Sequence, residues 1–370
     1  MSLPERWSTA LGHLRQQNRY RELSRPAGVD FSSNDYLGYA GRAPATCPDL
    51  PRSGAASRLL RGHHPVWDEV ESRLARWHGA EAALMLTSGY AANEGLLSTV
   101  VEPDDWVASD QLNHASIIDG LRLSRAGRYV YRHQDLDHLE AGLRAASRSR
   151  PAGRELFVVT ESIFGMDGDV TPLAALAEIA DRYGAHLIVD EAHATGCFGP
   201  TGSGLVDAEG LRGRVLATVH TGGKALGVCG AYVCGSARLR ELLVNRCRHF
   251  VFTTALPPSV GAWWNHALDR VATDDAGRDA LHQAAVTLRE ELAARGVAAR
   301  GKHYIVPVVL GGDSRALEAS RRLRAAGWDI RAVRPPSVPP GTARLRIAVH
   351  ADHAREALMA VAEEVAKLHG

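Results

Sequence analysis

The segment LFVVTESIFGMDGDVTPLAALAEIADRYGAHLIVD, residues 156–190, decides the fold class of this chain. It opens with an apolar run at 156–160 and closes with another at 186–190, each of a length that suits a buried strand. Between them, residues 172–183 place apolar side chains on one helical face after an opening proline, which suits a first helical turn. A strand, a helix and a strand in this order predict two parallel strands joined by a crossover helix.

The same alternation extends over residues 81–235. Short apolar or β-branched runs recur there, and helical patterns separate most of them. The runs are Ala82–Leu86, Trp106–Ser109, Arg128–Tyr131, Leu156–Thr160, His186–Asp190, Val215–Thr221 and Ala231–Cys234. The sequence therefore predicts an α/β fold whose large domain holds a mostly parallel seven-stranded sheet covered by helices. Ligands of such sheets bind beyond the carboxyl ends of the strands.

The pattern changes after Phe252–Pro258. A long helical region is expected at about 259–295, and a smaller α/β arrangement follows it. Its strands are expected near 304–310, 330–333 and 344–349, and its helices at 314–326 and 353–368. We therefore predict three parts, which are an N-terminal helix and arm (1–38), a large domain (39–262) and a small C-terminal α/β domain (263–370).

The composition is that of an ordinary globular protein. The chain has 370 residues, of which 45% are hydrophobic and 23% are charged, so disorder and coiled coil are poor interpretations. Its 43 basic and 42 acidic residues give a net charge of +1, which favours neither nucleic acid nor a membrane surface as a partner. The N-terminus shows no signal-peptide core, and we expect a cytoplasmic protein.

Cysteine and lysine usage narrows the chemistry. The five cysteines form no C-x-x-C pair, so we expect buried thiols and neither a disulfide framework nor a metal site. Only three lysines occur, Lys224, Lys302 and Lys367. A reaction that needs a lysine amine therefore has three candidates.

The string HLIVDEAH, residues 186–193, contains a predicted strand that ends at the acid Asp190. The imidazole of His193 follows three residues later. A DEAH string also occurs in helicase ATPases, but that interpretation needs an upstream G-x-x-x-x-G-K-[ST] loop, which this sequence lacks. Asp190 and His193 are then expected to face the ligand crevice. The alternative is that Asp190 only caps the next helix.

Lys224 lies in the segment TGGKALG, residues 221–227, directly after a predicted buried strand. Its small neighbours leave room for a bulky group, so Lys224 is a candidate for Schiff-base formation. Lys302 and Lys367 are expected to be ordinary surface lysines.

Two loops complete the predicted site. The segment TSGYAAN, residues 87–93, joins a strand to a helix whose N-terminal N–H groups suit a phosphate, although such a turn is often only a turn. His114 is either a structural histidine or a flat ring placed over a planar cofactor. A phosphate cradle, a flat ring, an acid and a lysine together are what pyridoxal phosphate requires.

With these motifs in place, the chain resembles the α-oxoamine synthases, a family of fold-type-I pyridoxal-phosphate enzymes, over nearly its whole length. The final segment, residues 334–346, resembles the branch of that family that acts in biotin biosynthesis. The segments that carry the resemblance are 33–38, 54–62, 87–93, 113–116, 159–168, 190–196, 221–227, 252–258 and 334–346.

The resemblance implies a role for each matching residue. Lys224 would hold the cofactor aldehyde and act as the base, Asp190 would pair with the pyridine nitrogen, and His114 would stack on the ring. The residues implied to bind the cofactor are Gly89, Tyr90, His114, Asp190, His193, Thr221, Lys224 and Gly165, with Thr253 and Thr254 reaching it from a second subunit. The residues implied to bind substrate are Arg346, for the amino-acid carboxylate, and Arg21, His114 and Ser337.

Two positions depart from the family pattern. Gly165 stands where relatives often have a serine, so a hydrogen bond is either missing or supplied by Ser162. Ser337 replaces a threonine and keeps only the hydroxyl.

The implied reaction is a decarboxylative condensation of L-alanine with a pimeloyl thioester, carried by coenzyme A or an acyl carrier protein, in a homodimer with shared active sites. The product would be 8-amino-7-oxononanoate. The alternatives are a glycine-using relative (glycine C-acetyltransferase or 5-aminolevulinate synthase type), an aminotransferase on the same fold, or a non-enzymatic binding module.

Overall fold

The computed structural model describes residues 1–42 and 49–369. Contacts divide the chain into two compact units, each described by itself below. The sheet unit comprises Leu37–Phe164 and Val170–Arg278, and the C-terminal unit comprises Met1–Tyr36, Gly165–Asp169 and Asp279–Gly370. The domain boundaries predicted after residues 38 and 262 remain a prediction.

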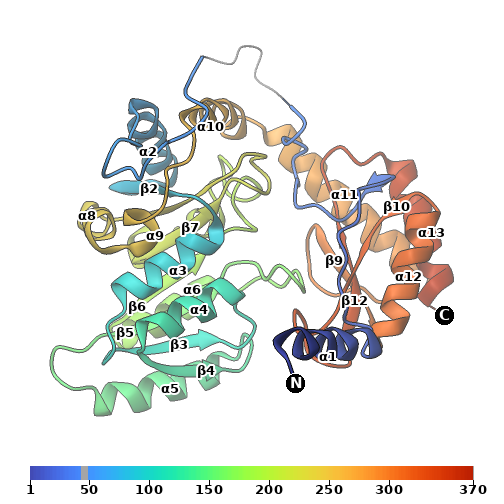
Figure 1. Cartoon of the computed structure of the whole chain (residues 1–370), viewed down its shortest axis with the longest axis horizontal. Coiled ribbons are helices and arrows are strands. Elements are labelled where there is room, and N and C mark those ends of the chain that lie inside the picture. Colours follow the sequence, from blue (N-terminus) through green and yellow to red (C-terminus); the bar gives the residue numbers. More distant parts are fainter. Residues whose placement is uncertain (43–48, 370) are drawn as a thin grey trace. The chain divides into compact units, whose positions relative to one another are not determined.

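The sheet unit is built on a seven-stranded sheet in the order β2-β8-β7-β6-β5-β3-β4 (Figure 1). Strands β3 to β7 pair in parallel, whereas β8 lies antiparallel between β7 and β2. The predicted fold-type-I architecture with a mostly parallel seven-stranded sheet is confirmed. The strands are β2 (Ala82–Leu86), β3 (Trp106–Asp110), β4 (Gly127–Tyr131), β5 (Leu156–Glu161), β6 (Ala185–Asp190), β7 (Ala217–Thr221) and β8 (Ala231–Gly235).

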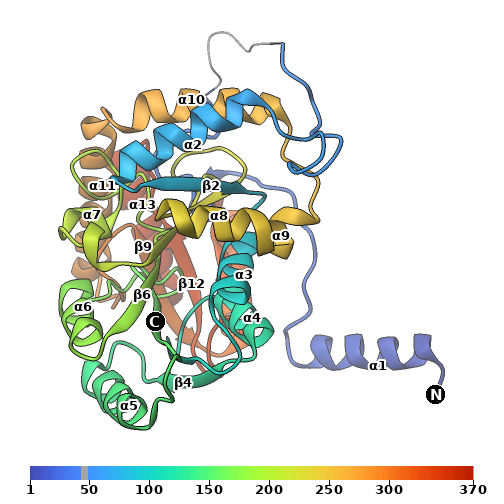
Figure 2. The same cartoon turned by 90° about the vertical axis from the view of Figure 1, so that its left-hand side faces the viewer.

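Helices cover both faces of this sheet. One buried cluster joins the sheet to α3, α4, α8 and α9, while α2, α5 and α6 contact the strands from the opposite face. Helices α2 and α10 lie side by side (Figure 2). The helices are α2 (Pro65–His78), α3 (Gly89–Val100), α4 (Ala115–Ser124), α5 (Leu136–Ser149), α6 (Leu173–Arg182), α7 (Leu205–Ala208), α8 (Ala237–Arg246), α9 (Arg248–Val251) and α10 (Pro258–Val271), with a 3₁₀ turn at Arg212–Arg214.

Helix α6 shows how the sequence pattern becomes packing. Leu173, Leu176, Ala177 and Ala180 recur at helical spacing, and each is at most 1% exposed. Pro172 lies at the N-cap of the helix, one position before the first turn in which it was expected. Because proline has no N–H to leave unpaired, it is tolerated at this end.

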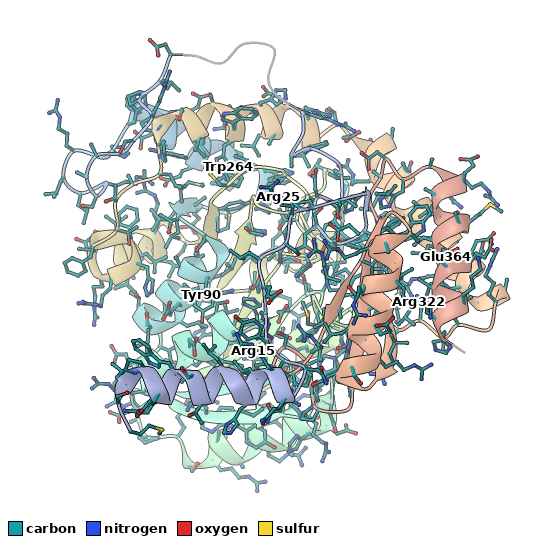
Figure 3. All side chains as sticks on the ribbon, turned by 45° about the vertical axis from the view of Figure 1, so that its right-hand side comes forward. Arg15, Arg25, Tyr90, Trp264, Arg322 and Glu364 are labelled. Carbon is teal, nitrogen blue, oxygen red and sulfur yellow. The ribbon has the colours of Figure 1, made fainter. Side chains whose placement is uncertain are left out.

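The C-terminal unit holds two small sheets. β1 (Val29–Asp30) pairs in parallel with β10 (Trp328–Asp329), and the antiparallel sheet has the order β11-β12-β9. Helices α12 and α13 turn polar residues outward, among them Arg322 (Figure 3). The remaining elements are α1 (Leu3–Gln16), β9 (Ile305–Gly311), α12 (Asp313–Ala325), β11 (Arg331–Val333), β12 (Ala343–Ala348) and α13 (Arg355–His369).

The helical region expected at about 259–295 is two helices. α10 ends at Val271, and α11 (Asp275–Ala294) begins after a short break. The Asp274 side chain accepts a hydrogen bond from the Gly277 N–H at 3.0 Å, which satisfies one donor of the first turn of α11. A side chain that caps locally favours a new helix start over a continuous helix.

Three of the cysteines, Cys197, Cys234 and Cys247, are buried free thiols, as predicted. The prediction is wrong for Cys229, which is exposed because it lies in the loop between β7 and β8. Cys47 lies outside the described residues. Within residues 1–42 and 49–369, no helix combines the length and apolar character needed to cross a bilayer.

Helix α4 offers a matched test of this packing. Leu121 is 1% exposed within the buried cluster, whereas Leu123 on the same helix is 54% exposed. We expect Leu121→Ala to lower the free energy of unfolding by about 2–5 kcal/mol because it leaves a cavity. Leu123→Ala should change it by less than about 0.5 kcal/mol. Urea unfolding followed by fluorescence measures both values, and equal losses would contradict the assigned orientation of α4.

Candidate functional site

The carboxyl ends of the central strands bring two acids and a lysine to one edge of the sheet. Glu161 ends β5 and Asp190 ends β6, and the two residues are aligned in register. Lys224 follows the end of β7 by three residues. Charges on Asp190 and Lys224 both act on Glu161 and on His114. The four side chains therefore share one electrostatic environment.

Asp190 is held by two donors. It is 6% exposed, and its Oδ2 accepts a hydrogen bond from Asn93 Nδ2 at 2.6 Å while its Oδ1 accepts one from the Ala192 N–H at 2.8 Å. Each carboxylate oxygen can accept a further hydrogen bond. His193, in the turn that follows, is 8% exposed.

His114 caps helix α4 and is fixed at both its backbone and its ring. Its N–H donates to Glu161 Oε1 at 2.7 Å, and its Nδ1 lies 2.7 Å from Ser116 Oγ. Partial desolvation lowers the pKa of the ring, Asp190 opposes that shift and Lys224 adds to it. The ring is therefore held in its neutral form near neutral pH.

Sequence reasoning missed Glu161 as a site residue. The side chain is 5% exposed, and its burial, together with the charge of Asp190, raises the pKa of Glu161 to about 8. Lys224 and the His114 N–H oppose this shift. The available signal was an acid at the last position of a strand that opens with four apolar residues, since burial of a carboxylate is costly and often marks a functional role.

The start of α3 has the features of a phosphate cradle. Ser88 Oγ caps the Ala91 N–H at 3.2 Å, so the N–H groups of Gly89 and Tyr90 at the helix N-terminus are available to an anion. A Cβ added at Gly89 would lie 3.7 Å from the Thr221 side chain, an ordinary contact distance, so Thr221 lies directly beside the helix end. Tyr90, marked in Figure 3, is 41% exposed, and its ring lies edge-on to His114 with centroids 6.1 Å apart.

The loop that carries Lys224 packs tightly against Trp264 of helix α10. A Cβ at Gly222 would lie 2.4 Å from the Val228 carbonyl oxygen and 2.5 Å from the ring of Trp264. Trp264, on α10, is fully buried and donates to the Cys229 carbonyl at 3.0 Å. Only a glycine fits at residue 222, and the tight packing there fixes the start of the loop that carries the half-buried Lys224.

Thr253 and Thr254 lie beside Thr87, with which they line a small hollow of the sheet unit. Thr87 immediately precedes the cap residue of the phosphate cradle. Thr254 is exposed and Thr253 is half-buried. Their assignment to the cofactor of a second subunit remains a prediction.

The other candidate substrate residues lie in the C-terminal unit. Arg346 is 7% exposed; its Nε donates to the Gly165 carbonyl at 2.5 Å, and its Nη2 donates to Asn34 Oδ1 at 2.9 Å and to the Tyr36 hydroxyl at 3.3 Å. Among the described residues, no acceptor pairs with Nη1. Arg21 and Ser337 are exposed.

The hydroxyl of Ser162, proposed as a substitute for the absent serine at 165, is already engaged. Ser162 is fully buried in the sheet unit, and its Oγ donates to the Asp190 carbonyl at 3.4 Å and also bonds the Glu191 side chain. Gly165 contributes its carbonyl oxygen to Arg346 instead.

A second polar cluster lies away from these residues. His78, His220 and Cys234 line a cavity of about 380 Å³ that contains none of the predicted site residues. His220 Nδ1 and Nε2 contact Thr195 and Thr218 at 2.8 and 2.7 Å, and His78 Nε2 contacts Tyr232 at 2.8 Å. The two imidazole rings stack at 4.0 Å. These nitrogens have protein partners, and the absence of a metal site remains a prediction.

Comparison with known proteins places the chain among enzymes with this architecture. Residues 26–365 match the family described as aminotransferase class I and II, and the chain belongs to this family. A solved structure of serine palmitoyltransferase from S. paucimobilis, with bound PLP-myriocin aldimine, superposes with a TM-score of 0.90 at 27% identity, covering 100% of this chain and 98% of that one. The chain is therefore a pyridoxal-phosphate enzyme of fold type I.

Sequence relatives narrow the assignment. An 8-amino-7-oxononanoate synthase from Anaeromyxobacter dehalogenans (strain 2CP-1) is 51% identical over 332 residues, which cover 88% of this chain and 82% of the relative. One from Chlorobaculum parvum is 40% identical over 393 residues, which cover 100% of both chains. A solved 8-amino-7-oxononanoate synthase from Francisella tularensis gives a TM-score of 0.75 at 26% identity, covering 92% of this chain and 97% of that one. The chain belongs to the 8-amino-7-oxononanoate synthase family of acyltransferases, which confirms the predicted resemblance.

The residues of the sheet unit fit this cofactor. A carboxylate with free acceptor capacity suits a pyridinium N–H, the N-terminal N–H groups of α3 at Gly89 and Tyr90 suit a phosphate, and the half-buried Lys224 suits an aldehyde. Pyridoxal phosphate is thus accommodated by groups that the fold already holds in place.

The raised pKa of Glu161 predicts a pH-dependent stability. Between its unfolded value near 4.5 and about 8, the native chain binds a proton at Glu161 that the unfolded chain releases. The contribution of Glu161 to the free energy of unfolding of the wild type therefore falls as pH rises through this window. Glu161→Gln removes the titration and keeps an acceptor for the His114 N–H. The difference in melting temperature, variant minus wild type, should grow from about pH 5 to about pH 8. The exposed control Glu178→Gln should show a constant difference, and a constant difference for Glu161→Gln would contradict the burial argument.

Proposed function

We propose that the chain condenses L-alanine with a pimeloyl thioester, with loss of CO₂, to give 8-amino-7-oxononanoate and the free thiol carrier in biotin biosynthesis. The observation that carries the proposal is the shared environment of Asp190, His114 and Lys224 at the strand ends of a chain 51% identical to a named 8-amino-7-oxononanoate synthase. When bound, pyridoxal phosphate supplies an electron sink for the carbon that loses its proton.

Different residues of the chain are assigned to different parts of the cofactor. The Asp190 carboxylate, fixed by Asn93 and Ala192, accepts the pyridinium N–H. The helix N–H groups at Gly89 and Tyr90 bind the phosphate. His193 bonds the ring hydroxyl, and Thr221 adds a donor to the phosphate.

Lys224 acts on the amino acid. Lys224 would hold the cofactor aldehyde, and its amine would remove the proton from the substrate Cα as general base. His114 covers the ring and contacts the substrate. Burial and the charge of Asp190 keep Glu161 protonated near neutral pH.

Arg346 binds the amino-acid carboxylate in this proposal. Its bonds to Gly165, Asn34 and Tyr36 fix the guanidinium plane within the C-terminal unit, and the free Nη1 group supports a role in carboxylate binding. Arg21 and Ser337 are assigned to the acyl substrate. The carrier is coenzyme A or an acyl carrier protein.

We further propose a homodimer in which Thr253 and Thr254 of each chain reach the phosphate of the other. The exposed position of Thr254 and of Phe252, which is 71% exposed, supports this assignment, because an exposed aromatic side chain is typical of an interface.

Lys224 is the first residue to test. We expect Lys224→Ala to reduce the rate of 8-amino-7-oxononanoate formation by at least about a thousandfold, since both the cofactor attachment and the base are lost. Lys302→Ala, which removes an exposed lysine, should keep the wild-type rate. Substantial turnover by Lys224→Ala, measured by product mass, would overturn the assignment of the base.

The amino-acid substrate is tested by visible absorbance of the cofactor-loaded protein, titrated in parallel with L-alanine, glycine and L-serine. We expect the cofactor band to respond to L-alanine far more strongly than to the other two. A response confined to glycine would identify a glycine-using relative, and one confined to L-serine would identify a serine-using enzyme, consistent with the serine palmitoyltransferase neighbour. Conversion of the cofactor to its amine form with a keto acid would identify an aminotransferase, and the absence of a cofactor band would overturn the proposal.

A further inference from the structure

Asn93 is bonded to two other polar residues of the site. It lies on α3, is 3% exposed, and its Nδ2 contacts both Asp190 Oδ2 at 2.6 Å and Ser116 Oγ at 3.0 Å. Ser116 lies on α4, is fully buried, and contacts His114 Nδ1 through its Oγ at 2.7 Å and its N–H at 3.2 Å. One chain of hydrogen bonds thus runs from the buried Asp190 through the buried Asn93 and Ser116 to His114, which is exposed.

The donors and acceptors in this chain follow from chemistry. Turning the Asn93 amide around would place its carbonyl oxygen 2.6 Å from a carboxylate oxygen, which is repulsive, so the NH₂ group must face Asp190. Its two hydrogens then go to Asp190 and to Ser116 Oγ. Because Ser116 Oγ accepts from Asn93, its own hydrogen is free for His114.

The same reasoning fixes the proton of the imidazole. The Ser116 backbone N–H can only donate, so His114 Nδ1 must be an acceptor and the ring hydrogen of the neutral form lies on Nε2. A hydrogen on Nδ1 would oppose the Ser116 N–H, which is held in place by helix α4. The ring therefore has one preferred tautomer, and its Nε2–H is the group left for a ligand.

We propose that Asn93 and Ser116 are positioning residues of this site, which join Asp190 to His114 and hold the His114 ring as the Nε2–H tautomer. The inference rests on the proposed function only for the identity of the ligand that the ring contacts. Neither residue touches the reacting atoms in this proposal. Each acts through the orientation of Asp190 or His114.

The test is the tautomer of His114, read by long-range ¹H–¹⁵N NMR on the full chain labelled with ¹⁵N-histidine, with and without pyridoxal phosphate. The imidazole resonances that disappear in the His114→Gln variant are assigned to His114. The wild type should show a protonated Nε2 and an unprotonated Nδ1. Ser116→Ala should shift the tautomer ratio toward Nδ1–H by roughly fivefold, since one hydrogen bond to Nδ1 is lost.

Two further variants separate positioning from folding. Ser116→Thr keeps the hydroxyl and should restore the wild-type tautomer. Ser124→Ala removes a buried hydroxyl of the same helix that donates only to the Leu121 carbonyl, at 2.9 Å, and should leave the His114 signal unchanged. A shift in Ser124→Ala equal to that in Ser116→Ala would mean that the tautomer follows helix stability, and it would overturn the proposal.

Asn93→Leu tests whether the chain of bonds is continuous. It removes the donor to Ser116 Oγ, so the hydroxyl is free to turn away from His114 and the Nδ1–H form should again gain population. Adding Asn93→Leu to Ser116→Ala should then produce no further shift, because both changes act through one hydroxyl. Additive shifts, or a tautomer ratio in Ser116→Ala equal to that of the wild type, would overturn the proposal. The NMR result does not depend on turnover, so a wild-type chain that shows the Nε2–H form but forms no 8-amino-7-oxononanoate would refute only the proposed function.

Discussion

Two carboxyl groups end neighbouring parallel strands in register, and the site is organised around keeping both of them buried. Glu161 and Asp190 point the same way from β5 and β6 because aligned residues of parallel strands share a face. Two negative charges on neighbouring strands in a buried site repel each other strongly. The structure relieves the repulsion by holding the proton on Glu161, whose pKa is raised to about 8, and by placing Lys224 nearby.

Asp190 and Glu161 carry the same functional group but have different hydrogen-bond partners. Asp190 accepts hydrogen bonds from an amide and a backbone N–H. Glu161 accepts a hydrogen bond from the His114 N–H but is only 5% exposed, and desolvation is the main cause of its raised pKa. The backbone of His114 is thereby tied to one acid, and its ring is tied to the other through Ser116 and Asn93.

In the C-terminal unit, two arginine side chains are likewise fixed by bonds to neighbouring residues. Arg344 forms a buried ion pair with Asp167, and Arg346, two residues further on the same face of β12, donates to the Gly165 carbonyl. The segment Gly165–Asp169 belongs to this unit by its contacts, although it follows β5 of the large sheet along the chain. The acceptor at 165 is a backbone carbonyl, so this bond to Arg346 does not depend on a side chain at that position.

Much of this protein was readable from the sequence. Short buried strands and amphipathic helices have distinct periodicities, so the seven strands of the large sheet and the α/β class followed from local pattern, as did the rarity of lysine that singled out Lys224. Tertiary structure alone decided the roles of Glu161, Asn93 and Ser116, as well as the break between α10 and α11 and the exposure of Cys229. These depend on which distant residues share a strand register or face one another between helices. Periodicity reports only the burial of a position, whereas the protonation of Glu161 and the tautomer of His114 are set by charges and donors that the fold brings together from far along the chain.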